Sequence, residues 1–215
     1  MFFNLSSSRL YGILDFGYVA DSEALRVARE MLEGGVDILQ LRAKNFDAAK
    51  ILSIATSIAP ICSQFGVPFI INDHPELVKP SGADGVHVGQ DDISVAEARE
   101  IVGPGKIIGL STHSLDQATA AAAQRPDYIG FGPLFATPTK PDYRPIGVVD
   151  IAAVHRLVQL PIFCIGGIKQ DNLTQITKAG AHRVVIVSGI LQASDIAGYC
   201  RECRSLLESE SLSIS

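Results

Sequence analysis

The sequence predicts a single α/β domain over residues 1–215, folded as a closed (β/α)8 TIM barrel. Short apolar runs alternate eight times with longer amphipathic segments, which is typical of β-α units around a parallel sheet. Polar residues follow nearly every apolar run, whereas a doubly wound open sheet, the alternative, binds its ligand at one switch point. A chain of 215 residues with 47% hydrophobic residues is sufficient for one such barrel.

The apolar runs are expected to form strands at residues 10–14, 38–41, 67–71, 85–88, 107–110, 127–131, 161–165 and 183–187. The amphipathic segments are expected to form helices near residues 21–33, 47–65, 75–79, 94–102, 114–124, 149–158, 171–179 and 194–207. Ser114 is placed to cap the fifth of these helices, and Gly66 to end the second. Residues 1–8 would be a short N-terminal extension, and the polar tail at residues 208–215 is expected to fray.

Charge and the length of apolar runs exclude several classes of protein. The net charge is -5 and no basic run is present, so we expect no nucleic-acid partner and no membrane partner. The segment Met1–Asn4 is too short for the apolar part of a signal peptide, and no apolar run approaches membrane-spanning length. The cytoplasm is therefore the expected compartment.

The four cysteines do not indicate a disulfide framework in a chain of this length. Cys200 and Cys203 form a C-x-x-C sequence, but this sequence lies in a helical pattern and has no second pair of ligands. We interpret them as two neighbouring thiols on one helix face.

The segment from Gly130 to Lys140 leaves the sixth apolar run through two glycines and a proline. These residues turn the chain off the strand, so that Thr137, Thr139 and Lys140 can present two hydroxyls and an ammonium together. Such a cluster suits a phosphate group. An ordinary surface loop is the alternative for this segment taken alone, since exposed Thr and Lys are common.

The second strand ends in Gln40-Leu41-Arg42-Ala43-Lys44. Alternation along an extended chain would send Gln40, Arg42 and Lys44 in the same direction. Arginine binds phosphate through a planar fork and lysine as a point charge, so this pair could hold a diphosphate. The alternative is an arginine and a lysine that snorkel at the entrance of a helix.

Carboxylates follow the third and fourth strands, as Asp73 after Asn72 and as Asp92 in the segment 89–92. Because strand ends meet at one face of a barrel, both carboxylates are expected near the phosphate-binding cations. Mg²⁺ prefers hard oxygen ligands with open positions for water and substrate phosphate, so the pair predicts a magnesium site. Each aspartate could instead cap the helix that follows it.

The fifth strand ends in Ser111-Thr112-His113. His113 could be a general base or a hydrogen-bonding wall of the site, and the residues alone leave both open. His87 lies within a strand pattern, and we interpret it as a core histidine with satisfied hydrogen bonds.

The last two strands carry a second phosphate signal, in Ile165-Gly166-Gly167-Ile168 and Val187-Ser188-Gly189-Ile190. Bare backbone N–H groups and a serine hydroxyl suit an anion, and phosphate sites after these two strands recur in this fold. The chain has no Ser-His-Asp arrangement, catalytic cysteine or dinucleotide fingerprint. Two anion sites and one metal site in a barrel mouth indicate a reaction between two phosphorylated molecules, one of which loses a Mg²⁺-bound diphosphate.

The motifs that carry this chemistry are Gln40-Leu41-Arg42-x-Lys44, Asn72-Asp73, Gly85-Val86-His87-Val88-Gly89-Gln90-Asp91-Asp92, Gly109-x-Ser111-x-His113, Gly132-Pro133-x-Phe135-x-Thr137-x-Thr139-Lys140, Gly166-Gly167-Ile168 and Val187-Ser188. Together they resemble the thiamine phosphate synthase family, also called thiamine-phosphate pyrophosphorylase. The resemblance covers nearly the whole chain in the same order.

The resemblance implies a (β/α)8 barrel that joins hydroxymethylpyrimidine diphosphate to a thiazole phosphate, giving thiamine phosphate and pyrophosphate. The residues that it implies for the pyrimidine diphosphate are Gln40, Arg42, Lys44, Asn72, Ser111 and Lys140, with Arg42, Lys44, Ser111 and Lys140 as catalytic residues. The residues that it implies for the thiazole phosphate are Thr137, Thr139, Gly167, Val187 and Ser188. It further implies that Asp73 and Asp92 bind Mg²⁺ and that a homodimer is possible.

The implied mechanism is dissociative, because the C–O bond to the diphosphate breaks before the thiazole nitrogen captures the pyrimidine cation. Such a step needs charge stabilisation on the diphosphate and exclusion of water, but no strong general base. The loop from Phe135 to Pro145 is expected to close as a lid.

The sequence departs from the family at Ala43, where glutamate is frequent, and at His74, where arginine is frequent. We expect altered contacts around the site more than lost activity. Three alternatives stay open: a thiazole tautomerase, which His113 would serve; a non-catalytic paralogue that binds thiamine phosphates; and a phosphosugar isomerase or epimerase. The last of these would leave Arg42 and Lys44 unexplained.

Overall fold

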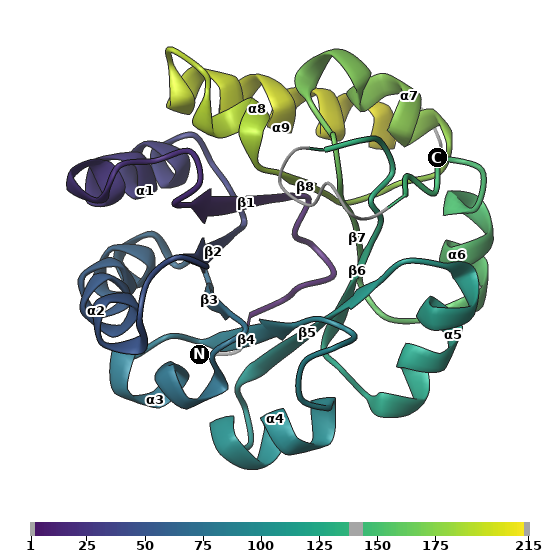
Figure 1. Cartoon of the computed structure of the whole chain (residues 1–215). Coiled ribbons are helices and arrows are strands. Elements are labelled where there is room, and N and C mark those ends of the chain that lie inside the picture. The colour runs from purple at the N-terminus through teal and green to yellow at the C-terminus, as the bar shows by residue number, and fades with distance from the viewer. Residues whose placement is uncertain (1–2, 138–143, 213–215) are drawn as a thin grey trace.

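The structure is a computed structural model that describes residues 3–137 and 144–212. Within these residues, eight parallel strands close into one barrel in the order β1 to β8, and β8 pairs with β1 (Figure 1). The helices form an outer ring around the strands. The closed sheet confirms the predicted (β/α)8 barrel and excludes the open doubly wound sheet, so the carboxyl ends of all strands meet at one face.

The strands are β1 (Leu10–Asp15), β2 (Ile38–Arg42), β3 (Phe69–Asn72), β4 (Gly85–Val88), β5 (Ile107–Thr112), β6 (Tyr128–Phe131), β7 (Ile162–Cys164) and β8 (Val184–Ile186). The α-helices are α1 (Ala24–Glu33), α2 (Ala48–Phe65), α3 (Val78–Ser81), α4 (Val95–Val102), α5 (Leu115–Gln124), α6 (Ile151–Leu157), α7 (Leu173–Lys178), α8 (Ser188–Leu191) and α9 (Ile196–Leu212). Short 3-10 helices are η1 (Asp21–Glu23), η2 (Pro75–Leu77) and η3 (Gln170–Asn172).

All eight predicted strands are present, and the differences lie in the helices. The helix expected near residues 75–79 is η2 followed by α3, and α8 was not predicted. The helix α9 continues to Leu212, so residues 208–212 are helical where a fraying tail was expected. An i,i+4 ion pair between Arg204 Nε and Glu208 Oε1, at 2.9 Å, supports the extra helical turn.

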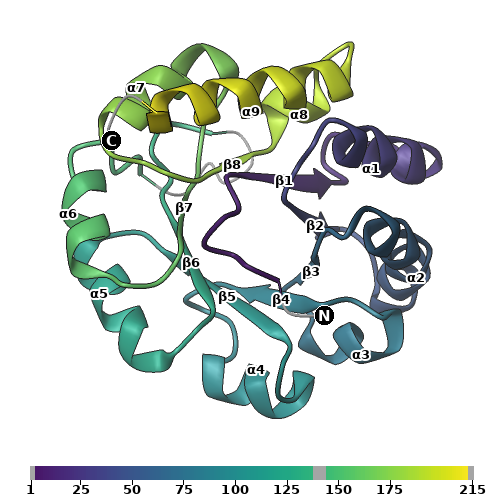
Figure 2. The same cartoon turned by 180° about the vertical axis from the view of Figure 1, so that it is seen from behind.

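The inside of the barrel is filled by a cluster of apolar and aromatic side chains: Tyr11, Ile13, Ile38, Ile70, Ile107, Tyr128, Phe163, Val185 and Leu5. Leu5 belongs to the segment before β1 and is only 9% exposed, and Phe3 packs against the same cluster. Figure 2 shows this segment crossing the end of the barrel where the strands begin. The predicted N-terminal extension therefore closes the end of the barrel opposite the expected site.

The helix α2 is 18 residues long and, by length and composition alone, apolar enough to cross a membrane. The sequence-based expectation that no run reaches this length was therefore wrong. One such helix is weak evidence of membrane insertion, because core helices pass the same test. Ile51, Ile54 and Ile58 bury one face of α2 in the main hydrophobic core, where it packs as one of the ring helices.

Three aspartates that precede even-numbered strands tie each strand to the one before it. In every case the aspartate N–H donates to the carbonyl of a residue in the preceding strand, at 2.7 to 2.8 Å. The carboxylate Oδ2 then accepts the N–H of that same residue, at 2.7 to 2.9 Å. The pairs are Asp37 with Leu10, Asp84 with Phe69 and Asp127 with Ile108. These two-point contacts hold the amino-terminal end of the barrel together.

Candidate active site

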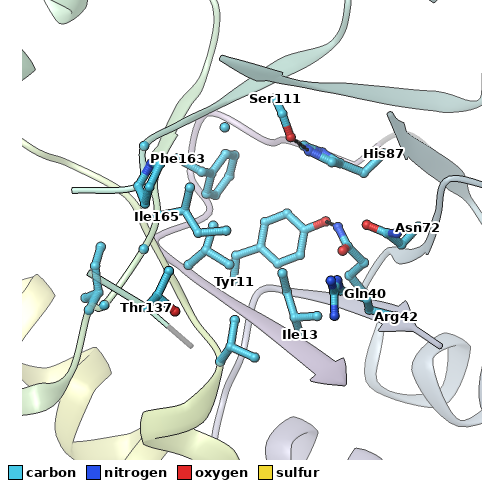
Figure 3. A pocket seen from close by; sticks show the side chains of 18 of the residues that line it. Tyr11, Ile13, Gln40, Arg42, Asn72, His87, Ser111, Thr137, Phe163 and Ile165 are labelled. Atoms are coloured by element: carbon cyan, nitrogen blue, oxygen red, sulfur yellow. Dashed lines mark hydrogen bonds between the residues drawn. The ribbon is translucent and has the colours of Figure 1, made fainter. Parts of the chain in front are cut away.

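One pocket opens at the carboxyl ends of the strands and brings together residues from the whole length of the chain (Figure 3). Eight of the residues that the resemblance implies for substrate binding line it: Gln40, Arg42, Asn72, Ser111, Thr137, Gly167, Val187 and Ser188. Gln40, Arg42 and Asn72 lie on one side in Figure 3 and Thr137 on the other. The pocket therefore carries polar side chains on two opposite sides.

Gln40 and Arg42 project from β2 as the alternation predicted, and each is held by a partner from β1. The Gln40 amide nitrogen donates to the Tyr11 hydroxyl at 2.7 Å. Arg42 Nη1 lies 2.6 Å from Asp15 Oδ2, with side chains only 15% and 3% exposed. Both polar groups are thus oriented by the protein itself.

Lys44 does not follow its strand neighbours into the pocket. It lies beyond the end of β2, and its Nζ forms an ion pair with Asp73 Oδ2 at 2.7 Å. Asp73 has a positive φ of 63° and donates its N–H to the His87 carbonyl at 2.9 Å. Asp92 Oδ2 accepts the Gly89 N–H at 2.7 Å. None of Lys44, Asp73 and Asp92 is among the residues that line the pocket.

His87 differs from the prediction of a core histidine, because it lines the pocket. Its Nδ1 lies 3.0 Å from the Tyr128 hydroxyl and its Nε2 lies 2.9 Å from Ser111 Oγ. His87 is therefore hydrogen-bonded, as expected, but it connects the barrel interior to a predicted binding residue. His113 also lines the pocket, and its Nδ1 donates to the Gly132 carbonyl at 2.6 Å.

The loops after β6 and β7 are locked to each other by backbone hydrogen bonds. Leu134 N–H donates to the Ile165 carbonyl at 2.8 Å, and Phe135 N–H donates to the Gly166 carbonyl at 3.0 Å. A Cβ on Gly166 would lie 2.3 Å from Pro133 Cβ, and one on Gly167 would lie 2.7 Å from Phe135 Cβ. Both glycines also have positive φ. Only glycine allows this close approach of the two loops.

In the loop after β6, Thr137 is the last residue that the structure describes before the gap at residues 138–143. Thr139, Lys140 and most of the expected lid at residues 135–145 lie outside the described residues. After β8, Ser188 begins α8, and it lines the pocket together with Val187.

Sequence reasoning missed the aromatic floor of the pocket and the anchor of Arg42. Tyr11, Tyr128 and Phe163 are buried and line the pocket from below. They meet edge to face, with ring centroids 5.4 to 5.8 Å apart. In the sequence these three residues lie within apolar strand runs, where an aromatic residue is expected to belong to the hydrophobic core. Asp15 is a polar residue at the end of β1, and this position is the sequence signal that indicates it as a site residue.

The fold and the pocket together define a (β/α)8 barrel enzyme. The family model described as thiamine monophosphate synthase matches residues 10–190, and the chain belongs to this family. It is accordingly a transferase of thiamine biosynthesis.

Known relatives agree over nearly the full length. The thiamine-phosphate synthase of Halalkalibacterium halodurans is 39% identical over 201 residues, covering 93% of this chain and 95% of that protein. The thiamine-phosphate synthase of Chloroflexus aurantiacus is 38% identical over 200 residues, covering 93% and 92%. The solved thiamine phosphate pyrophosphorylase from Pyrococcus furiosus superposes with a TM-score of 0.87 at 29% identity, covering 96% of this chain and 98% of that one.

More distant structures share the fold alone. A 3-hexulose-6-phosphate synthase superposes with a TM-score of 0.72 at 19% identity, covering 92% of this chain and 99% of that one.

Proposed function

We propose that this transferase condenses 4-amino-2-methyl-5-hydroxymethylpyrimidine diphosphate with a thiazole phosphate, giving thiamine phosphate and pyrophosphate. The observation that supports this most is that one pocket joins two polar ends. Gln40, Arg42 and Asn72 stand at one end and Thr137 at the other, with apolar side chains between them (Figure 3).

In this proposal the diphosphate of the pyrimidine substrate binds to Arg42, Lys44 and Lys140, while Gln40, Asn72 and Ser111 orient the rest of that molecule. Arg42 suits this role because Asp15 fixes its guanidinium at the pocket wall. The phosphate of the thiazole would bind to Thr137 and Thr139, to the bare backbone of Gly167, and to Val187 and Ser188.

We further propose that Asp73 and Asp92 bind Mg²⁺. They follow β3 and β4, which are neighbouring strands paired in register at Asn72 and His87, and their carboxylates are hard oxygen donors. The described residues contain no group of three or more His, Cys, Asp and Glu side chains that could hold a metal. Two carboxylates still fit Mg²⁺, which is commonly bound by one or two carboxylates, water and substrate phosphate.

The ion when bound would neutralise charge on the leaving diphosphate. In this proposal Lys44, which forms an ion pair with Asp73 at 2.7 Å, would exchange or share that partner when the diphosphate binds.

The proposed mechanism is dissociative, with breakage of the C–O bond to the diphosphate before the thiazole nitrogen attacks. Cationic side chains at the diphosphate end stabilise the leaving group. Apolar side chains of Ile13, Phe163 and Ile165 line the space between the two ends and limit water around the cation. We also propose a cytoplasmic location and a homodimer.

Release of pyrophosphate by the purified full-length protein tests the proposal, with omission of each substrate and of Mg²⁺ as controls. We expect release only when all three are present. Asn72→Ala should raise KM for the pyrimidine diphosphate about tenfold or more, and Thr137→Val should do so for the thiazole phosphate alone. Thiazole phosphate binding without any release would favour the tautomerase or a non-catalytic paralogue instead.

A further inference from the structure

An unbroken chain of hydrogen bonds crosses the inside of the barrel from β2 to β5. Gln40 Nε2 donates to the Tyr11 hydroxyl at 2.7 Å, and the two hydroxyls of Tyr11 and Tyr128 lie 2.9 Å apart. The Tyr128 hydroxyl lies 3.0 Å from His87 Nδ1, and His87 Nε2 lies 2.9 Å from Ser111 Oγ. The two ends of the chain, Gln40 and Ser111, are both pocket residues (Figure 3).

The glycine at position 109 makes the central contact of this chain possible. His87, Gly109 and Tyr128 stand at one level on β4, β5 and β6, as register partners of one another. A Cβ on Gly109 would lie 2.1 Å from Tyr128 Cζ, 2.4 Å from its hydroxyl oxygen and 2.5 Å from His87 Nδ1. The side chains of His87 on β4 and Tyr128 on β6 meet only because β5, between them, has a glycine at this level.

The number of protons on these hydroxyl and imidazole groups determines which group donates and which accepts in each hydrogen bond. Tyr11 already accepts a proton from Gln40, and within the described part of the structure its hydroxyl has one other partner, Tyr128. If Tyr128 donated to Tyr11, the Tyr11 proton would have no acceptor although this side chain is only 2% exposed. A buried donor without an acceptor is costly, so Tyr11 donates to Tyr128.

The rest of the chain follows from this first step. Tyr128 must donate its own proton to His87 Nδ1, because its hydroxyl has no other partner among the described residues. The imidazole then carries its proton on Nε2 and donates it to Ser111 Oγ. A doubly protonated imidazole is excluded for the same reason, since it would turn the Tyr128 proton back towards Tyr11. Burial raises the pKa of both phenols, so neither proton is lost near neutral pH.

We propose that Tyr128 and His87 are positioning residues that fix the proton direction of Ser111. With His87 Nε2–H donating to its oxygen, Ser111 directs its own hydroxyl proton into the pocket and accepts nothing more from that side. The Ser111 hydroxyl therefore selects a ligand atom that accepts a hydrogen bond. That this atom belongs to the pyrimidine diphosphate rests on the proposed function. An analogue with a donor at the same place would be disfavoured.

Nuclear magnetic resonance of the full-length protein with ¹⁵N-labelled histidine tests the proton direction without any substrate. We expect the Nε2–H tautomer for His87 in the unliganded protein, with the signal assigned by its loss in His87→Gln. Tyr128→Phe removes the donor to Nδ1 and should shift the ring to the Nδ1–H tautomer or to a mixture. Tyr11→Phe also removes a phenol hydroxyl, but one that does not contact His87. It should keep the Nε2–H tautomer because Tyr128 still donates to His87 Nδ1.

Steady-state kinetics supply the second measurement. Tyr128→Phe should raise KM for the pyrimidine diphosphate about tenfold while KM for the thiazole phosphate stays within about twofold, since one oriented hydrogen bond is affected. Gly109→Ala should reproduce this pattern if it folds. A wild-type Nδ1–H tautomer, or a Tyr128→Phe variant with unchanged tautomer and unchanged KM, would overturn the proposal. Failure of the wild-type protein to condense the substrates would instead count against the proposed function, because the tautomer is measured independently.

Discussion

The carboxylate of Asp15 holds Arg42 across one rung of the barrel. Asp15 and Arg42 are register partners on β1 and β2, and Oδ2 of the first lies 2.6 Å from Nη1 of the second. The other carboxylate oxygen accepts the Gly17 N–H at 2.8 Å. The arginine that we assign to the diphosphate is therefore oriented before any substrate arrives.

Asp15→Ala should lower the free energy of unfolding by about 3 kcal/mol, because it leaves a mostly buried guanidinium without its counter-ion. It should also raise KM for the pyrimidine diphosphate, since Arg42 loses its fixed orientation. Urea unfolding and steady-state kinetics measure the two effects. Asp15→Asn keeps a hydrogen-bond acceptor and should lose less unfolding free energy than Asp15→Ala. The exposed Glu100→Gln serves as a control, and an Asp15→Ala variant as stable as this control would contradict the prediction.

Asp84→Ala should separate stability from activity. Its carboxylate accepts the N–H of Phe69, a residue only 1% exposed, so the variant leaves a buried donor without a partner. We expect a loss of about 1 to 3 kcal/mol in unfolding free energy. Because Asp84 lies before β4, at the end of the barrel away from the pocket, kcat and both KM values should remain near those of the wild type. A large fall in kcat at full folding would refute this separation.

Acid should destabilise the protein through His155. Burial, followed by the charges of His182 and Arg183, lowers the pKa of His155 to about 4. The unfolded chain, with a histidine pKa of about 6.5, then binds more protons than the native state between these two values. Stability from this group is therefore complete above about pH 6.5 and falls as the pH drops towards 4, by about 1 to 2 kcal/mol after allowance for partial exposure.

Thermal unfolding as a function of pH measures this loss. His155→Phe should flatten the slope in this range, because it removes the group whose pKa burial lowers. An unchanged slope in His155→Phe would show that other groups cause the acid sensitivity.

The four cysteines should stay unreactive while the protein is folded. All four are free and buried, and burial raises the pKa of each thiol to about 12. The thiolate is the reactive form, so an aromatic disulfide reagent near pH 8 should label them only as fast as the protein unfolds. Rapid labelling of two thiols in the native protein would point to an exposed Cys200–Cys203 pair and contradict this prediction.

The sequence by itself determined the order and type of nearly every element. Apolar runs and amphipathic segments are recognised from the periodicity of apolar residues, and this periodicity depends only on residues close together in the sequence. It also placed Gln40, Arg42, Asn72 and Ser111 at strand ends, and barrel closure then brings all strand ends to one face. Helix ends were less predictable, as α9 shows, because a pair such as Arg204 and Glu208 extends a helix through interactions that polarity alone does not reveal.

Only the tertiary structure decided which groups touch one another. His87 and Tyr128 are 41 positions apart in the sequence, and their contact depends on a missing side chain at Gly109 on the strand between them. Lys44 follows the same alternation as Arg42, yet it pairs with Asp73 because β2 ends at Arg42. Contacts across a closed barrel depend on register and on the space left by every neighbouring side chain. The periodicity of residues along one strand determines neither the register between strands nor the space that neighbouring side chains leave.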